Sequence, residues 1–276
     1  MGTRSGCLLL CALAAGAGAI VVAGNGGRGV AASENAELLR PFVPAVNMNK
    51  DGRLPPKEFA RRAGVGSDGL VEQVGATGLI RCGSATGTGQ LTVRNDVITT
   101  AAHVLIDQYG KHRIGCVFEP TMAGGGPVPV DFNSIKTGST MPLSHRATRD
   151  WAVARLLAPV KGVAPYQLGS AGSAPTAVLM CAGGNRSGAA IGLEKCSTRR
   201  VIGAASDGIR ELAIDCNAGP GSSGAALIAG DKVVAIYVGY RSSDPGKAQA
   251  FSDTHYNFAI TVEGPFRRAL LTAAQR

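Results

Sequence analysis

Short apolar runs separated by turn-forming residues make up most of the chain from Leu70 onward. Gly, Asn-Asp and Pro-Gly sequences lie between the runs, as is typical of strands joined by tight turns. The runs cover residues 78–81, 89–93, 97–100, 114–118, 128–132, 151–157, 177–182, 200–202, 212–214 and 233–238. This pattern of short apolar runs predicts an all-β domain.

Two segments have helical spacing instead. Residues 33–40 end at a proline and predict a short helix near the N-terminus. Residues 263–274 place Phe266, Leu270 and Leu271 on one helical stripe. We expect this last segment to form a C-terminal helix that lies on the β body.

Composition agrees with the pattern. The chain of 276 residues is 45% hydrophobic but only 5% aromatic, with 39 glycines and 14 prolines. Such a chain suits many short strands better than a helical bundle. The net charge of +9 comes from scattered Lys and Arg without a nucleic-acid motif. We therefore expect no nucleic-acid partner and interpret the charge as a solubility feature, with another acidic partner as the alternative.

The first 32 residues are organised like a signal peptide. Arg4 precedes an apolar run over residues 7–24, and small residues continue to Ala32, where cleavage is expected. An uncleaved membrane anchor is the alternative, but the run is short and rich in Gly and Ala. The mature chain should be secreted or periplasmic, with no stable membrane association.

Cysteine usage fits export. Two of the seven cysteines leave with the signal peptide, so five remain, and the odd count requires a free thiol or an intermolecular bond. We expect disulfides Cys82–Cys116 and Cys196–Cys216, which leaves Cys181 over. A Cys181–Cys196 bond and a set of buried free thiols both stay open as alternatives.

Residues 47–58 resemble an EF-hand calcium loop. Oxygen-bearing side chains fall at loop positions one, three, five and twelve, a glycine permits the turn at position six, and position seven offers its backbone carbonyl. The residues that would hold calcium are Asn47, Asn49, Asp51, Arg53 and Glu58.

This copy departs from the EF-hand pattern, because Asn47 replaces the usual aspartate and no second EF-hand is visible. We therefore expect either weak calcium binding or a decayed loop that keeps its helix–turn–helix shape. Residues 33–68 would form a separate EF-hand-like segment ending in a linker, and a propeptide is a second interpretation of them. No cofactor other than calcium is expected, and none is expected to be required.

Residues 215–227 carry two serines, Ser222 and Ser223, in a glycine-rich run between strand-like segments. Serine is a poor nucleophile unless a base takes its proton and donors receive the oxyanion. Glycines let the backbone turn sharply and direct its N–H groups outward, as an oxyanion hole requires. Taken alone, the segment is equally well explained as a loop between strands.

Two further segments carry polar groups where plain strands would not. Residues 97–104 run from an apolar strand into small residues and then His103, a position that can present a base. Asp150 opens the apolar run 151–157, so its carboxylate should be half-buried and in need of a hydrogen-bond partner. Taken alone, His103 is explained as a structural histidine and Asp150 as a strand cap or turn residue.

Together the three segments resemble the chymotrypsin-like (trypsin-fold) serine proteases, with the bacterial, glutamyl-endopeptidase-like branch as the most similar group. The match covers residues 69–276, nearly all of the chain beyond the EF-hand-like segment. It lies on Thr100-Ala101-Ala102-His103, then Asp150, then Gly221-Ser222-Ser223-Gly224, in the family's order of His, Asp and Ser.

The resemblance implies two six-stranded β-barrels with the active site in the cleft between them. It makes Ser223 the nucleophile, His103 the general base and Asp150 the group that orients the imidazole. The backbone N–H groups of Gly221 and Ser223 would form the oxyanion hole. Ser222 is the competing nucleophile, although the G-x-S-G register favours Ser223.

The sequence departs from the family where activation and specificity are decided. In trypsin an aspartate precedes the nucleophile and pairs with a freshly cut N-terminus, whereas Ser222 stands in that place here. Asn217 does not support a preference for Arg or Lys, and Tyr237 stands where glutamyl enzymes have a histidine. The expected primary pocket consists of Asn217, Ala218, Tyr237, Val238, Gly239 and Tyr240.

The sequence therefore predicts an exported serine endopeptidase that hydrolyses protein or peptide substrates through an acyl-enzyme. The first alternative is a binding protein on the same scaffold without useful turnover. The second is a calcium-binding module whose β body serves as an interaction surface.

Overall fold

The structure is a computed structural model that describes residues 51–122, 124–184, 190–244 and 247–275. Several sequence predictions fall outside these residues, namely the signal peptide (1–32), the helix at 33–40 and the calcium-loop residues Asn47 and Asn49. Among the described residues, no helix is long and apolar enough to cross a membrane.

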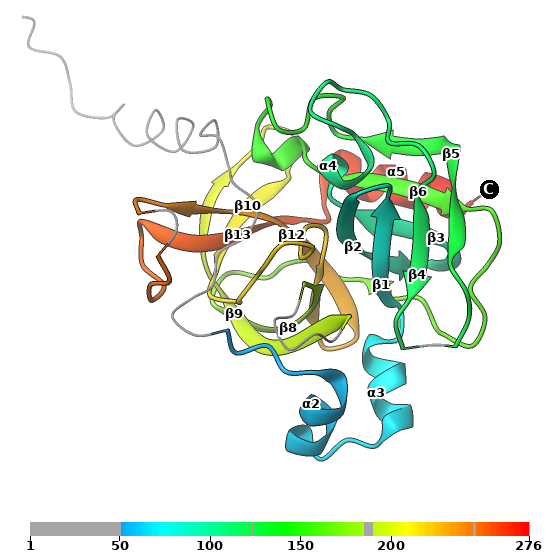
Figure 1. The fold of residues 1–276 in the computed structure, drawn as a ribbon. Helices are drawn as coiled ribbons and strands as arrows, with labels where there is room; N and C mark the ends of the chain where they lie inside the picture. Colours follow the sequence, from blue (N-terminus) through cyan, green and yellow to red (C-terminus); the bar gives the residue numbers. More distant parts are fainter. Residues whose placement is uncertain (1–50, 123, 185–189, 245–246, 276) are drawn as a thin grey trace, which may run out of the picture.

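The first barrel consists of six antiparallel strands in the order β1-β2-β3-β6-β5-β4 (Figure 1). Strand β1 pairs with both β2 and β4, which closes the ring. Large apolar side chains fill its core, and Ile80, Leu91 and Phe118 have no exposed surface. The strands are β1 Thr77–Cys82, β2 Ala85–Thr92, β3 Arg94–Thr100, β4 Val117–Pro120, β5 Val128–Thr137 and β6 Ala152–Leu156.

The second barrel follows in the chain and has the strand order β11-β8-β9-β10-β13-β12. Pairing of β11 with β12 closes it, and the short strand β7 adds in parallel to β12. The strands are β7 Gln167–Leu168, β8 Thr176–Gly183, β9 Ile191–Ala204, β10 Arg210–Ile214, β11 Ala226–Ala229, β12 Lys232–Ser242 and β13 His255–Thr261. The prediction of two six-stranded barrels is confirmed.

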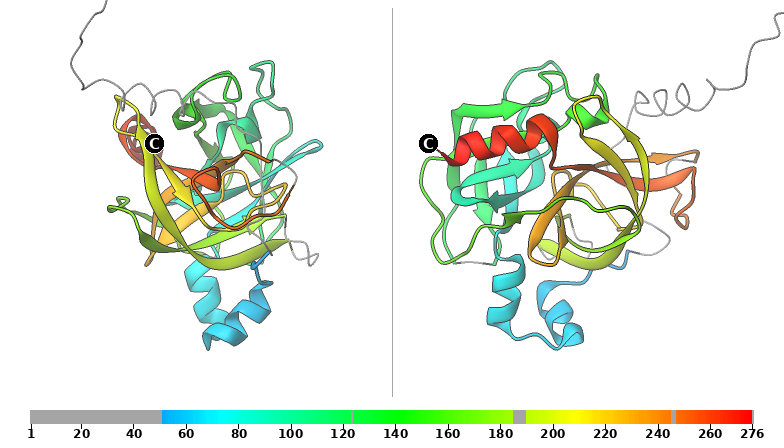
Figure 2. Two further views of the ribbon diagram at one scale, coloured as in Figure 1. Left: turned by 90° about the vertical axis from the view of Figure 1, so that its left-hand side faces the viewer. Right: turned by 180° about the vertical axis from the view of Figure 1, so that it is seen from behind.

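The C-terminal helix α5 (Gly264–Ala274) follows the last strand of the second barrel but packs on the first barrel, as the rear view in Figure 2 shows. The Phe266 ring stacks on Trp151 with ring centroids 5.1 Å apart. Phe266 and Leu270 are buried, while Leu271 is exposed. The sequence predicted this helix at residues 263–274. It follows the second barrel in the chain and contacts β3, β5 and β6 of the first.

Two short helices, α2 (Pro56–Ala63) and α3 (Ser67–Val74), lie outside both barrels, below them in Figure 1. Helix α3 buries Leu70 and Val74 and leads into β1. The predicted start of the protease domain at residue 69 therefore falls inside a helix. The sequence pattern missed α3 because the helix is short and contains Gly69.

Two disulfides form as expected, Cys82–Cys116 in the first barrel and Cys196–Cys216 in the second. Cys181 is a buried free thiol. The alternatives of a Cys181–Cys196 bond and of free thiols throughout are wrong. Each bond stays within one barrel, so each barrel has its own covalent link.

Candidate active site

His103 and Asp150 meet at the ends of two paired strands of the first barrel. His103 lies in the short helix α4 (Ala102–Leu105) after β3, and Asp150 follows the 3-10 helix η1 (Ala147–Arg149) just before β6. Because β3 pairs with β6, the Thr100–Ala152 register brings these two ends side by side. The fold thus joins residues that are 47 positions apart in sequence.

The Asp150 carboxylate is fully buried and holds His103 at two points. Its Oδ2 lies 2.6 Å from His103 Nδ1, and its Oδ1 accepts the His103 backbone N–H at 2.9 Å. A carboxylate only accepts hydrogen bonds, so Nδ1 carries a proton, and in the neutral imidazole the lone pair is then on Nε2. This is the imidazole tautomer that a general base needs.

The two adjacent serines have different environments. Ser222 is fully buried, its Oγ donates to the Gly183 carbonyl at 2.9 Å and it accepts the Gly219 N–H at 3.0 Å. Ser223 binds the first barrel through its backbone carbonyl, which accepts the Thr88 N–H at 2.8 Å. The donor and both acceptor positions of the Ser222 hydroxyl are therefore used within the protein.

Gly224 shows how closely this loop approaches the histidine segment. A Cβ added there would lie 2.2 Å from Thr100 Oγ1 and 2.8 Å from the Ala101 nitrogen, and its φ of +87° is left-handed. Only glycine fits such a position. Ser223 thus sits one residue from direct contact with the turn that carries His103.

The N–H groups of the serine loop differ in their hydrogen bonds. Ser222 N–H donates to Gly219 O and Gly224 N–H to Tyr237 O, at 2.9 and 2.8 Å. The hydrogen bonds among the described residues include none from the N–H of Gly221 or Ser223. Gly221 has a φ of +93°, and this turn lets alternate N–H groups face away from the loop.

The predicted pocket residues are buried, and two of them donate hydrogen bonds to residues outside the predicted set. Asn217 donates its N–H and its Nδ2 to Glu194, both at 2.7 Å, and burial raises the pKa of that carboxyl. Tyr237 donates its hydroxyl to Asn257 Oδ1 at 3.2 Å. Tyr237, Val238 and Ala218 have no exposed surface, and Tyr240 is 7% exposed. Gly239 lies between them in β12.

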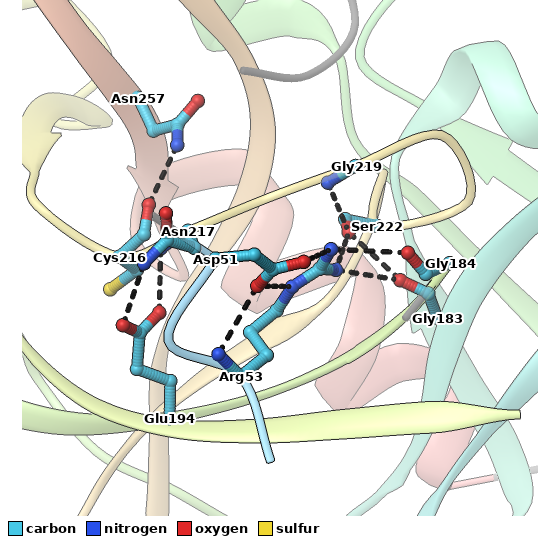
Figure 3. A network of polar contacts seen from close by, with 10 residues as sticks. All are labelled: Asp51, Arg53, Gly183, Gly184, Glu194, Cys216, Asn217, Gly219, Ser222 and Asn257. Atoms are coloured by element: carbon cyan, nitrogen blue, oxygen red, sulfur yellow. Dashed lines mark hydrogen bonds and ion pairs between the residues drawn. The ribbon is translucent and has the colours of Figure 1, made fainter. Parts of the chain in front are cut away.

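Arg53 and Glu194 are site residues that the sequence analysis missed. Figure 3 shows the Arg53 guanidinium beneath the nucleophile loop, against Ser222 and the carbonyls of Gly183 and Gly184. The sequence placed Arg53 in a calcium loop as a backbone ligand. No local pattern marks either contact, because the loop partners of Arg53 are 130 or more positions away and Glu194 is 23 positions from Asn217.

The described calcium-loop carboxylates bind arginines. Both Asp51 oxygens accept from Arg53, at 2.9 and 2.8 Å. Glu58, in α2, accepts from Arg61 and Arg62, and these hydrogen bonds lower its pKa to about 2. A cation would have to compete with these ion pairs, and calcium binding stays a prediction.

No protein-family model and no curated protein sequence matches the chain. Among solved structures, a Glu endopeptidase gives a TM-score of 0.63 at 14% identity, covering 84% of this chain and 100% of its own. Anisep, a protease from Arthrobacter nicotinovorans, gives a TM-score of 0.51 at 13% identity, and the match covers 74% of this chain and 98% of Anisep. AL20, a thermostable serine protease from an extremophilic microorganism, gives a TM-score of 0.52 at 12% identity, and the match covers 73% of this chain and 97% of AL20. The chain has the chymotrypsin fold, and its structural neighbours are serine proteases.

Proposed function

We propose that the chain is a serine endopeptidase with Ser223 as nucleophile, His103 as general base and Asp150 as the orienting carboxylate. The observation that carries the proposal is the fully buried Asp150 carboxylate, held 2.6 Å from His103 Nδ1. Burying a carboxylate is unfavourable unless it is well bonded. Here its bonds fix one imidazole tautomer beside a serine loop, as the reaction requires.

In the proposed reaction, Ser223 Oγ attacks the scissile carbonyl carbon while His103 Nε2 takes the hydroxyl proton. The N–H groups of Gly221 and Ser223 bind the resulting oxyanion. His103 then gives the proton to the leaving amine as the C–N bond breaks, which leaves an acyl-enzyme. Water hydrolyses this ester with His103 again acting first as base and then as acid.

We infer that the substrate is a protein or peptide and that its side chain at the cleavage site is small. Asn217, Ala218 and Tyr237 stand at the pocket positions, and all three are buried by their neighbours. Neither a carboxylate at residue 217 nor a histidine at 237 is present to select basic or acidic residues. We place the protein in the periplasm or outside the cell, since its two disulfides suit an oxidising compartment.

A binding protein on the same scaffold is the second candidate. The burial of the pocket side chains favours it, because a substrate would have little pocket surface to contact. The two candidates differ in whether Ser223 is activated. A calcium-binding module is the third candidate, and a calcium-dependent rise in melting temperature that Glu58→Gln abolishes would support it.

The first test is labelling of the protein with a fluorophosphonate probe. We expect wild type to be labelled, Ser223→Ala to be unlabelled and His103→Ala to lose activity by roughly 10⁶-fold, as in other triads. Ser222→Ala is the matched control and should still be labelled. A folded wild-type protein that stays unlabelled would refute the enzyme proposal in favour of the binding protein.

A further inference from the structure

The Arg53 side chain lies under the nucleophile loop, although it belongs to the segment that precedes both barrels. Its side chain is only 1% exposed, and it reaches the loop from below in the close-up of Figure 3. Among the described residues, its hydrogen bonds include none to Ser223. Its contact is with Ser222, the residue between the two proposed oxyanion donors, Gly221 and Ser223.

All five N–H donors of the guanidinium are used. Nε donates to Asp51 Oδ1 at 2.9 Å, and Nη2 donates to Asp51 Oδ2 at 2.8 Å and to the Gly184 carbonyl at 3.1 Å. Nη1 donates to the Gly183 carbonyl at 3.1 Å and to Ser222 Oγ at 3.0 Å. A planar fork with five donors fits this set of acceptors, and a lysine ammonium with three does not.

The Ser222 hydroxyl links this fork to the loop. It accepts from Arg53 and from the Gly219 N–H, and it donates to the Gly183 carbonyl. One donor and two acceptor positions are all that a hydroxyl has. Arg53 thereby holds the Ser222 side chain in place. The peptide unit that follows Ser222 carries the Ser223 N–H, and Gly221 directly precedes Ser222.

The chain before α2 is held in place independently of Arg53. Leu54 and Leu193 of β9 exchange two backbone hydrogen bonds, at 2.8 and 2.9 Å. The Phe59 side chain is buried. Asp51 balances the buried guanidinium charge, as a desolvated arginine requires. Residues 51–54 therefore form a built-in support for the loop.

We propose that Arg53 is a positioning residue for the oxyanion-binding loop, an inference that rests on the proposed serine-protease function. Ser222 lacks the charge to pair with a freshly cut N-terminus, and Arg53 supplies the missing support without any cut. Residues 51–54 then belong to the active protein. Cleavage after Arg53, as in removal of residues 33–68 as a propeptide, would inactivate it.

The test compares Arg53→Met and Arg53→Lys with Arg61→Met, the same substitution on the exposed face of α2. The readouts are the maximal rate of fluorophosphonate labelling and the probe concentration at half-maximal rate. We expect both Arg53 variants to lower the maximal rate roughly 100-fold, comparable with the loss of one oxyanion donor. The half-maximal concentration should change little, and Arg61→Met should behave like wild type.

Chemical rescue separates loop support from general damage. In Arg53→Ala, millimolar guanidinium chloride should restore part of the labelling rate, whereas sodium chloride at equal ionic strength should not. Hydrogen exchange gives a readout that needs no activity: the amides of Gly219 and Ser222 should exchange faster in Arg53→Met, with exchange in the first barrel unchanged.

Each outcome bears on one proposal. Wild-type labelling and wild-type exchange in Arg53→Met would overturn the role of Arg53 and leave the protease proposal standing. An unlabelled wild type would instead refute the protease proposal, and exchange at Gly219 and Ser222 would still decide whether Arg53 orders the loop. If Arg53→Met does not fold, Arg53→Lys decides, and a wild-type labelling rate there overturns the inference.

Discussion

At the scale of single residues, the two adjacent serines of the loop have different surroundings. Ser222 has no exposed surface, and its hydroxyl makes three hydrogen bonds, with Arg53, Gly183 and Gly219. The Ser223 backbone carbonyl accepts the Thr88 N–H of the first barrel, and the next residue, Gly224, lies against Thr100 and Ala101, just before His103. Two neighbours of the same chemical type thus have different surroundings, and we propose a structural role for Ser222 and a catalytic one for Ser223.

Substitution of each serine by alanine should therefore affect different properties. Ser222→Ala leaves buried donors without an acceptor, and we expect it to lower the free energy of unfolding by about 1–3 kcal/mol. Labelling should slow but persist. Ser223→Ala should be nearly neutral in stability and abolish labelling. Urea denaturation together with probe labelling checks both, and loss of labelling in Ser222→Ala alone would reverse the assignment.

Cys181 is a second residue whose environment decides its chemistry. Burial raises the pKa of its thiol to about 12, against which the hydrogen bond with Thr77 has a smaller effect. Thr77 Oγ1 also lies 2.8 Å from the Tyr166 hydroxyl, whose pKa burial also raises. A thiol in such surroundings stays protonated and unreactive.

We expect iodoacetamide to leave Cys181 unmodified in the native protein at pH 8 and to modify it after denaturation. Since the folded pKa lies above the unfolded value of about 9, the unfolded state releases its proton first. The contribution of Cys181 to the free energy of unfolding is therefore fully present below pH 9. It decreases between pH 9 and pH 12, by at most about 1.4 kcal/mol per pH unit. Mass spectrometry of the Cys181 peptide measures the reactivity, and Cys181→Ala should remove its share of the pH dependence.

At the scale of elements, an ion pair crosses three neighbouring strands of the second barrel. Arg241 on β12 lies 2.7 Å from Glu211 on β10, and both side chains are buried. Between them, on β13, the Phe258 ring lies 4.3 Å from the guanidinium carbon. The pair therefore ties β10 and β12 together across β13.

Loss of either partner should leave a buried charge uncompensated. We expect Glu211→Ala and Arg241→Ala each to cost about 3–5 kcal/mol in the free energy of unfolding. Arg199→Ala, which breaks a half-exposed ion pair with Asp215, should cost less than about 1 kcal/mol. Equilibrium denaturation in urea measures the free energy of unfolding of each variant. Equal losses in the three variants would contradict the prediction.

Most strands of the first barrel could be predicted from the sequence, because each is an apolar run flanked by turn residues. Strand β4 begins later than the predicted run 114–118, since Ile114 is exposed. Strands β11 and β13 were missed. The first is short and follows the serine loop directly, and the second contains the polar residues His255 and Asn257, which are buried and hydrogen-bonded in the barrel.

At the scale of the whole molecule, each barrel has one disulfide and the site lies where the barrels meet. The Cys82–Cys116 bond spans 34 residues of the first barrel. The Cys196–Cys216 bond spans 20 residues and ends next to Asn217, at the start of the serine loop. The two bonds have similar loop lengths but different distances in sequence from the nucleophile.

Replacing either cysteine pair by alanines should lower the free energy of unfolding by about 3–4 kcal/mol, from the loop-closure entropy of the unfolded chain. We expect only the Cys196→Ala/Cys216→Ala variant to slow the labelling of Ser223 as well, because its bond anchors the loop. Thermal melting and labelling rates at a temperature where both variants are folded separate the two effects. Equal labelling rates would show that the loop does not depend on this bond.

The sequence by itself determined the β strands of the barrels and the C-terminal helix, because each leaves a local pattern of apolar residues. It also predicted His103, Asp150 and Ser223 as the catalytic residues, from short runs of small residues and from the start of an apolar run. It also favoured the two disulfides that form. Only the tertiary structure showed that the Ser222 hydroxyl is buried and fully hydrogen-bonded, and that Arg53 is one of its partners. Arg53 and Ser222 are 169 positions apart, and a hydrogen bond across that separation depends on how two segments pack, which no local pattern of residues encodes.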